Sequence, residues 1–357
     1  MRYMRENLHV SAWGRICLFG EHQDYLALPV IAAAIGLSIT IDGTPCRDKL
    51  ITLDLPDVGQ RVQYELDSDL PYGQPRDYLP AVLNVLRREG VVPKCGWDCT
   101  VRGTIPINAG SSSSSALVVA FVKFLLEAAG IEKSPTDVAI LANRAEVLEF
   151  GEPGGLMDHY ASALGGVHYL DFTHQPAQVE QLNAPISGFV LGNSLEPKAT
   201  TYVLSGARQQ AEAALAWLAE HAPQLDFRTS PRADFSGTLS QMPDELCCKL
   251  SANLVNRDLC QQARAMLANG SVDGAELGRM LTEHHRQLSD GIGVSTPKLD
   301  SMVQSALDAG ALGAKLNGSG GGGCMFAYAP GRELQVAQAL EQAGGKAYIL
   351  RIPAGAV

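Results

Sequence analysis

A run of five serines at residues 111–115 restricts the fold of this chain more than any other feature. Gly110 precedes the run, and the apolar segment 116–129 follows it directly and stops at Gly130. Serine before an apolar helical segment is an N-cap signal, and glycine just after one is a C-cap signal. The sequence therefore predicts a helix over residues 116–129 that begins at a serine-lined turn.

This helix start is suited to binding a phosphate. The first helical turn leaves backbone N–H groups unpaired, and the helix dipole favours an anion. Small side chains let a phosphate approach, and hydroxyls add a hydrogen bond or a metal ligand. A flexible serine-rich loop is the alternative, and no Gly-Lys-Ser/Thr follows as a Walker A loop would require. We predict that the phosphates of a nucleotide contact Pro106, Asn108, Gly110, Ser111, Ser112, Ser113, Ser114 and Ser115.

Three further segments carry polar or glycine-rich patterns at wide spacing. Residues 14–25 read Gly-Arg-Ile-Cys-Leu-Phe-Gly-Glu-His-Gln-Asp-Tyr, and residues 313–324 read Gly-Ala-Lys-Leu-Asn-Gly-Ser-Gly-Gly-Gly-Gly-Cys. Between them, Glu146 and Asp158 stand twelve positions apart. With the serine run, these segments resemble the motifs of the GHMP kinase superfamily, which includes galactokinase, homoserine kinase, mevalonate kinase and phosphomevalonate kinase. The resemblance extends from about residue 10 to about residue 330, and Gly-Glu-His-x-Asp-Tyr is the galactokinase form.

The resemblance implies an α+β fold of two domains, the GHMP kinase fold. A domain like ribosomal S5 domain 2 would span residues 1–185 and carry the phosphate loop and catalytic residues. A ferredoxin-like domain would span residues 186–357 and carry the glycine-rich loop, with the active site between the two. Periodicity and turn residues predict strands over 8–65, 97–103, 167–172, 186–195 and 324–329. They predict helices over 76–89, 134–150, 245–309 and 332–343, a helix from about residue 201, and a loop or linker over 222–243.

A kinase of this kind would use ATP and Mg²⁺. Magnesium is satisfied by one or two protein oxygens together with phosphates and waters. The resemblance assigns Glu146 and Ser114 as metal ligands. Ser113 is the alternative to Ser114, because five identical residues leave the alignment of the serine run open by one position. Asp158 is predicted as the catalytic base and Arg15 as its electrostatic partner; a helix N-cap and a surface ion pair are the alternatives. A guanidinium keeps an aspartate ionised but weakens it as a base, so Asp158 can also act by orienting the acceptor hydroxyl.

The acceptor is predicted to be a monosaccharide. In galactokinases the positions of Glu21, His22 and Asp24 contact sugar hydroxyls, and we add His159 to this group. Gly320 and Gly321 are assigned to the cofactor side of the glycine-rich loop, which composition alone would describe as a linker. Three weaker sugar-pocket candidates are Tyr160, Tyr169 and Asp171.

The chain departs from galactokinases at three places. Leu26-Ala27-Leu28 stands where galactokinases usually have Asn-Gly-Gly, and His159 stands where they have glutamine. The glycine-rich motif at residues 317–323 reads Asn-Gly-Ser-Gly-Gly-Gly-Gly instead of Thr-Gly-Gly-Gly-Phe-Gly-Gly. We therefore predict ATP-dependent phosphorylation of a sugar at its anomeric C1 hydroxyl without naming galactose. Alternatives are a mevalonate- or homoserine-type kinase and a non-catalytic sugar sensor. The presence of Arg15, Ser114, Glu146 and Asp158 argues against the sensor.

Composition restricts the partners and the compartment. The net charge of −10 argues against nucleic acid, because binding a phosphate backbone needs a basic surface. The longest apolar run, residues 28–41, is shorter than the roughly 20 residues that span a bilayer. We expect a cytoplasmic monomer or homodimer without a membrane partner. The eight cysteines lack zinc-ribbon spacing and are predicted to be free, buried thiols.

Overall fold

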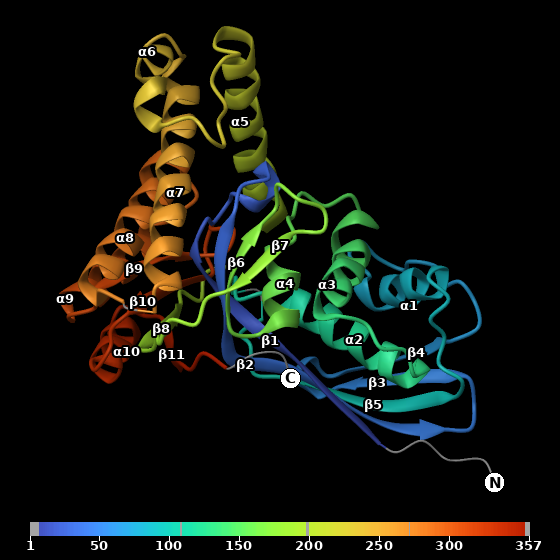
Figure 1. Ribbon diagram of the computed structural model, residues 1–357. Coiled ribbons are helices and arrows are strands. Elements are labelled where there is room, and N and C mark those ends of the chain that lie inside the picture. The colour runs from blue at the N-terminus through green and yellow to red at the C-terminus, as the bar shows by residue number, and fades with distance from the viewer. Residues whose placement is uncertain (1–6, 108, 198–199, 271, 354–357) are drawn as a thin grey trace.

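The computed structural model describes residues 7–107, 109–197, 200–270 and 272–353, and it contains two sheets (Figure 1). The first has the strand order β4-β3-β5-β2-β6-β7, with β1 paired to β2, and the second has the order β11-β8-β10-β9. Neighbouring strands are antiparallel except β3 and β5. The first sheet comprises β1 Leu8–Phe19, β2 Val30–Cys46, β3 Leu50–Leu55, β4 Gln60–Glu65, β5 Gly96–Gly103, β6 Val167–Asp171 and β7 Gln178–Gln181; the second comprises β8 Phe189–Asn193, β9 Gly313–Asn317, β10 Cys324–Tyr328 and β11 Lys346–Leu350.

Helices α1 to α4 pack on one face of the first sheet (Figure 1). Their core contains the buried rings of Trp97, Phe121 and Phe124, and the Trp97 and Phe124 rings meet edge to face at 5.2 Å. Gly43 makes room for this pair, because a Cβ there would lie 2.4 Å from the Phe124 ring. The helices are α1 Tyr78–Arg88, α2 Ser113–Ala129, α3 Pro135–Asn143 and α4 Met157–Leu164, with a π-helical turn at Arg144–Leu148.

The second sheet joins the first through an apolar layer. Phe189 and Phe326 of β8 and β10 pack with Ile16 and Leu18 of β1 and with helices α7 and α8. Alternate residues such as Val190 face the other way and pack against α9 and α10. This layer packs β1, a strand of the first sheet, against the second sheet. The remaining helices are α5 Thr200–His221, α6 Ser236–Leu239, α7 Asp244–Ala268, α8 Gly274–Arg286, α9 Pro297–Asp308 and α10 Glu333–Gln342, with a π-helical turn at Gln287–Ile292.

Most predicted elements are present, and the differences have local causes. The helix predicted over 134–150 starts at the expected cap, where Ser134 and Asp137 form a reciprocal capping box, but it changes to the π-helical turn at Arg144. The segment 222–243, predicted as a loop or linker, is mostly turn and loop, but it also contains the short helix α6 and the fully buried Phe235, which packs between α5 and α7. The short strands β7, β9 and β11 were not predicted, whereas β6, β8 and β10, each of five residues, were.

The eight cysteines are free, as predicted, but only Cys17, Cys99, Cys260 and Cys324 are buried, and Cys248 is exposed. Within the described ranges, every helix is too short or too polar to span a membrane.

Candidate active site

A cleft of about 230 Å³ lies where β1, the serine loop (residues 109–112), α4 and the glycine loop (residues 318–323) meet. Twelve of the predicted site residues line it: Arg15, Glu21, His22, Asp24, Gly110, Ser112, Ser113, Ser114, Ser115, Glu146, Asp158 and His159. Residues from sequence positions more than 300 apart therefore share one cavity.

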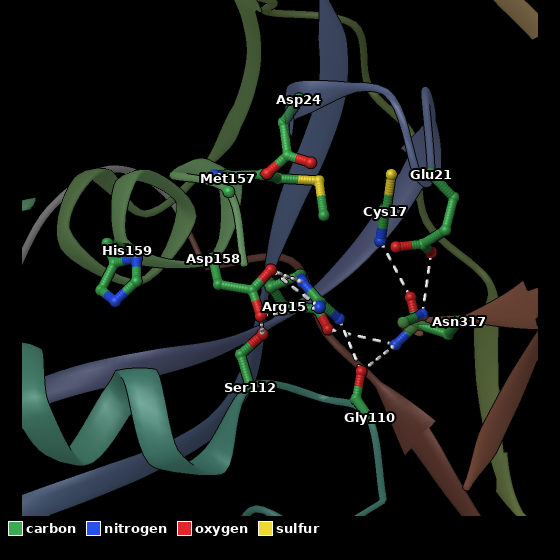
Figure 2. Close-up of polar contacts among 12 residues, drawn as sticks. Arg15, Cys17, Glu21, Asp24, Gly110, Ser112, Met157, Asp158, His159 and Asn317 are labelled. Atoms are coloured by element: carbon green, nitrogen blue, oxygen red, sulfur yellow. Dashed lines mark hydrogen bonds and ion pairs between the residues drawn. The ribbon is translucent and has the colours of Figure 1, made fainter. Parts of the chain in front are cut away.

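Arg15 and Asp158 form a two-pronged ion pair at the floor of the cleft (Figure 2). Arg15 Nε donates to Asp158 Oδ1 at 2.8 Å, and Arg15 Nη2 donates to Asp158 Oδ2 at 2.9 Å. The third guanidinium nitrogen, Nη1, donates to the Gly110 carbonyl at 2.6 Å. Paired N–H groups of this kind match a carboxylate in geometry as well as charge. The guanidinium is therefore oriented by both the aspartate and the serine loop.

Ser112 adds a second donor to Asp158. Its hydroxyl donates to Asp158 Oδ2 at 2.6 Å, and its backbone adopts a left-handed φ of 61°. Helix α2 begins one residue later, so Ser112 stands at the N-cap position without capping the helix through its side chain. Burial raises the pKa of Asp158, but the charge of Arg15 and the hydrogen bonds from Arg15 and Ser112 outweigh it and lower the pKa below its ordinary value. Asp158 is therefore held ionised.

The serine loop presents the start of α2 to the cleft. Helix α2 begins at Ser113, three residues earlier than predicted, and Ser113, Ser114 and Ser115 line the cavity. Ser111 is fully buried and donates towards Cys324 Sγ at 3.8 Å. Pro106 is buried outside the cleft lining, and Asn108 lies outside the described residues. The unpaired N–H groups of the first turn of α2 therefore face the site.

Glu21 and His22 connect the end of β1 to the C-terminal segment. Glu21 Oε2 accepts hydrogen bonds from the Gly318 N–H at 2.8 Å and from Lys315 Nζ at 3.3 Å. His22 lies between the Tyr25 hydroxyl at 2.9 Å and the Ser319 carbonyl at 3.1 Å. Both side chains thus hold the first residues of the glycine loop against the cleft.

Sequence reasoning missed Lys315 and Asn317. Lys315 is fully buried, and its Nζ also donates to the Cys17 carbonyl at 2.8 Å. The Asn317 side chain accepts from the Cys17 N–H at 2.9 Å and donates to the Gly110 carbonyl at 3.0 Å (Figure 2). A lysine and an asparagine in the mainly apolar segment before the glycine run could have indicated buried hydrogen bonds, since buried polar side chains need partners.

Asp24 faces the cleft beside the start of α4. Its oxygens accept from the Tyr25 N–H at 3.0 Å and the Met157 N–H at 3.2 Å. Gly155 permits this approach, because a Cβ there would lie 1.8 Å from Asp24 Oδ2. Burial and then the charge of Asp158 raise the pKa of Asp24 to about 6, although the two backbone hydrogen bonds oppose the shift.

Glu146 and His159 form a separate buried pair. Glu146 projects from the π-helical turn, and its Oε2 lies 2.8 Å from His159 Nε2. Figure 2 shows the His159 ring on the far side of α4 from Arg15 and Asp158. The His159 ring thus contacts Glu146, whereas the sequence predicted a contact between His159 and the sugar acceptor.

The donor set near Glu146 fits a magnesium ion that is also held by phosphates. The Glu146 carboxylate and the hydroxyls of Ser113 and Ser114 line the same cleft, and hard oxygen donors suit Mg²⁺. No cluster of three or more His, Cys, Asp or Glu side chains able to hold a metal occurs within the described ranges. A nucleotide would have to supply the remaining ligands.

Several predicted residues lie outside the cleft lining. A Cβ on Gly320 would lie 2.0 Å from the Val294 carbonyl, and one on Gly321 would lie 2.5 Å from Val203, so these glycines pack against the C-terminal segment. Gly318 and Ser319 reach the cleft in their place. The weaker candidates Tyr160, Tyr169 and Asp171 do not line it either.

Comparison with known proteins gives three family matches. The N-terminal domain of GHMP kinases matches residues 77–166, the C-terminal domain matches residues 265–347, and the galactokinase galactose-binding signature matches residues 2–45. The last segment contains Arg15, Glu21, His22 and Asp24.

Similar proteins include both sugar and mevalonate kinases. The mevalonate kinase of Pyrococcus furiosus is 30% identical over 96% of this chain and 95% of its own. The galactokinase of Thermococcus kodakarensis is 30% identical over 90% of this chain and 89% of its own. The structure of Lactococcus lactis galactokinase with galactose superposes with a TM-score of 0.86 at 22% identity, covering 99% of this chain and 95% of the other. The chain therefore belongs to the GHMP kinases, and it is a kinase with the two-domain fold of that family whose acceptor is a sugar or another alcohol.

Proposed function

We propose that this kinase transfers the γ-phosphoryl group of ATP to the anomeric C1 hydroxyl of a neutral monosaccharide, with Mg²⁺ as cofactor. One observation carries the proposal. The Arg15–Asp158 pair, the start of α2 and the carboxylate of Asp24 all line a single cleft. Phosphoryl transfer depends on bringing donor phosphates and acceptor hydroxyl together in a fixed, charged environment.

The nucleotide end of the site is assigned to the serine loop. ATP is the donor used by this family, and unpaired N–H groups at the start of α2 suit its phosphates. Ser114, or Ser113 in the other register, and Glu146 would hold Mg²⁺, which offsets phosphate charge and orients the γ-phosphoryl. Arg15 lies beside the acceptor end and would stabilise charge on the transferring group.

Asp158 is assigned the acceptor hydroxyl, chiefly as an orienting group. Both of its oxygens already accept charge-assisted or hydroxyl hydrogen bonds, and its pKa is lowered. Such a carboxylate is a weak base until negative charge has built up near it. We expect it to accept a hydrogen bond from the hydroxyl and to receive the proton late, when the O–P bond is largely formed.

The sugar assignment is supported by the galactose-binding signature, which matches residues 2–45, the segment that contains Glu21 and Asp24. Mevalonate is the second candidate, because a mevalonate kinase is 30% identical along 96% of the chain. An acyclic carboxylic acid would need a free cation. The two arginines that line the cleft, Arg15 and Arg76, are paired with Asp158 and Glu152, so the cleft favours a neutral acceptor.

A coupled ADP-release screen tests this function. D-Galactose, other aldoses, uronic acids, R-mevalonate and L-homoserine would be compared at equal concentration, with the Asp158→Asn variant as the control for contaminating kinases. We expect a neutral aldose to give the highest kcat/KM and the product to lose its reducing end. Faster turnover of R-mevalonate than of every sugar would refute the assignment.

Repulsion between a substrate carboxylate and the carboxylates of Glu21 and Asp24 can be tested separately. Two carboxylates about 4 Å apart repel by about 1–4 kcal/mol, depending on the local dielectric. We therefore expect each neutral aldose to exceed its matching uronate in kcat/KM near neutral pH. A uronate preferred about tenfold or more, roughly 1.4 kcal/mol, would overturn the neutral-sugar assignment.

A further inference from the structure

We propose that His159 is a positioning residue for the metal: its imidazole forms the hydrogen bond that fixes the orientation of the Glu146 carboxylate, which would hold Mg²⁺. This inference rests on the proposed function and extends it. It gives a role to a side chain that the sequence had assigned to the acceptor.

The Glu146 carboxylate lies in a buried environment. The side chain is buried, and it projects from the π-helical turn at Arg144–Leu148, a feature that often marks functional sites. Its one hydrogen-bond partner among the described residues is His159, and no arginine or lysine of that part of the chain forms an ion pair with it. A buried carboxylate without a cation is costly, so the site calls for one.

The His159 ring is held inside the protein. It is 1% exposed, and its Nε2 lies 2.8 Å from Glu146 Oε2. A hydrogen bond between two buried side chains fixes the position of both, so His159 orients the Glu146 carboxylate.

The hydrogen bond to His159 engages one oxygen of the Glu146 carboxylate, Oε2. Oε1 is left for Mg²⁺ beside Ser113 and Ser114, which line the same cleft. Hydrogen bonds to ligating carboxylates and imidazoles commonly tune metal affinity, and their loss costs about 10–100-fold.

The adjacent residues explain why the pair is separate from the acceptor. Asp158 and His159 are neighbours in α4, yet Figure 2 shows Asp158 facing Arg15 and the His159 ring facing away from both. One helical turn thus supplies the acceptor end with one residue and the metal end with the next.

The experiment compares His159→Gln and His159→Asn, two amide side chains that differ only in length. In His159→Gln the amide nitrogen takes the place of Nε2, and in His159→Asn it takes the place of Nδ1, so only glutamine keeps the bond to Glu146. Binding of Mn²⁺ to the full chain in the presence of ADP would be measured by electron paramagnetic resonance of free Mn²⁺. Galactose binding without metal and the thermal midpoint would be measured in parallel.

We expect His159→Asn to weaken Mn²⁺–ADP binding about tenfold or more, and His159→Gln to stay within about threefold of the parent chain. Galactose binding should not change in either variant. In the Glu146→Gln background, His159→Asn should have no further effect on Mn²⁺, because a residue that acts through Glu146 has nothing left to position.

Three results would overturn the proposal: equal Mn²⁺ affinity in the two amide variants, weaker galactose binding with unchanged Mn²⁺ affinity, or additive losses in the double variant. If His159→Asn does not fold, His159→Met removes the donor with an apolar side chain and is compared with His159→Gln in the same way. Because Mn²⁺–ADP binding needs no acceptor, failure of the sugar assignment in the screen leaves this test intact.

Discussion

Replacing Lys315 with methionine tests whether a buried charge pair holds the glycine loop in place. Lys315 is fully buried on β9, and its Nζ bonds the Cys17 carbonyl at 2.8 Å and Glu21 Oε2 at 3.3 Å. Glu21 is itself only 2% exposed and also accepts the Gly318 N–H at 2.8 Å. Methionine fills similar space without the charge, so the change isolates the loss of the ammonium.

The expected cost follows from the state of Glu21 in the variant. Removing one partner of a buried ion pair leaves an uncompensated charge and typically costs about 3–5 kcal/mol. Here one backbone N–H still bonds the carboxylate, so we expect the lower part of that range, about 3 kcal/mol. The double change Lys315→Met with Glu21→Gln removes the charge altogether. It should recover at least about half of the loss, since a neutral amide costs less to bury than an unpaired carboxylate.

Urea denaturation followed by circular dichroism, with thermal midpoints as a second measure, would give these differences. The control is Lys49→Met, which breaks an exposed 3.5 Å pair with Asp67 and should cost no more than about 1 kcal/mol. A loss below about 1 kcal/mol for Lys315→Met, or a double variant no more stable than the single one, would refute the reasoning.

Four further expectations concern the cleft. Asp158→Asn should lower kcat by at least about 10²-fold with nucleotide binding retained, and activity within about threefold of the parent in steady-state assays would exclude a catalytic role. Gly155→Ala should raise the sugar KM at least about tenfold, since its Cβ would lie 1.8 Å from Asp24 Oδ2, whereas Gly154→Ala, with its nearest contact at 3.5 Å, should not. The pKa of Asp24 is raised to about 6, so the native state binds this proton more tightly than the unfolded chain does. The unfolding free energy of the parent chain, relative to that of Asp24→Asn, should therefore fall by about 1–3 kcal/mol from pH 4 to pH 6.5. The same difference between the two proteins at both pH values, measured by urea denaturation, would contradict this. Ser114→Ala should raise the Mg²⁺ concentration needed for half-maximal activity, and an effect confined to Ser113→Ala would move the metal ligand by one position.

Local sequence was sufficient for the elements that position the site. The serine run predicted the start of α2, and the cap at Ser134 predicted α3. Both signals lie in a short segment, where turn chemistry, capping and periodicity act between near neighbours. The pairing of Arg15 with Asp158, which are 143 positions apart, was predicted instead from the resemblance to GHMP kinases. The burial of Phe235 within the loop over 222–243 was not predicted, because it depends on α5 and α7 rather than on its own neighbours.

Tertiary structure alone decided which polar side chains meet. The bonds from Lys315 to Glu21 and from Asn317 to Cys17 join residues about 300 positions apart, and the left-handed turn at Ser112 points its hydroxyl at Asp158 instead of at α2. The π-helical turn likewise brings Glu146 to His159, although both residues had been read separately from the sequence. A sequence pattern states which side chains can ionise or donate. Their partners depend on the packing of β1 against the second sheet, because a buried polar group is satisfied only by whatever the fold places within hydrogen-bond reach.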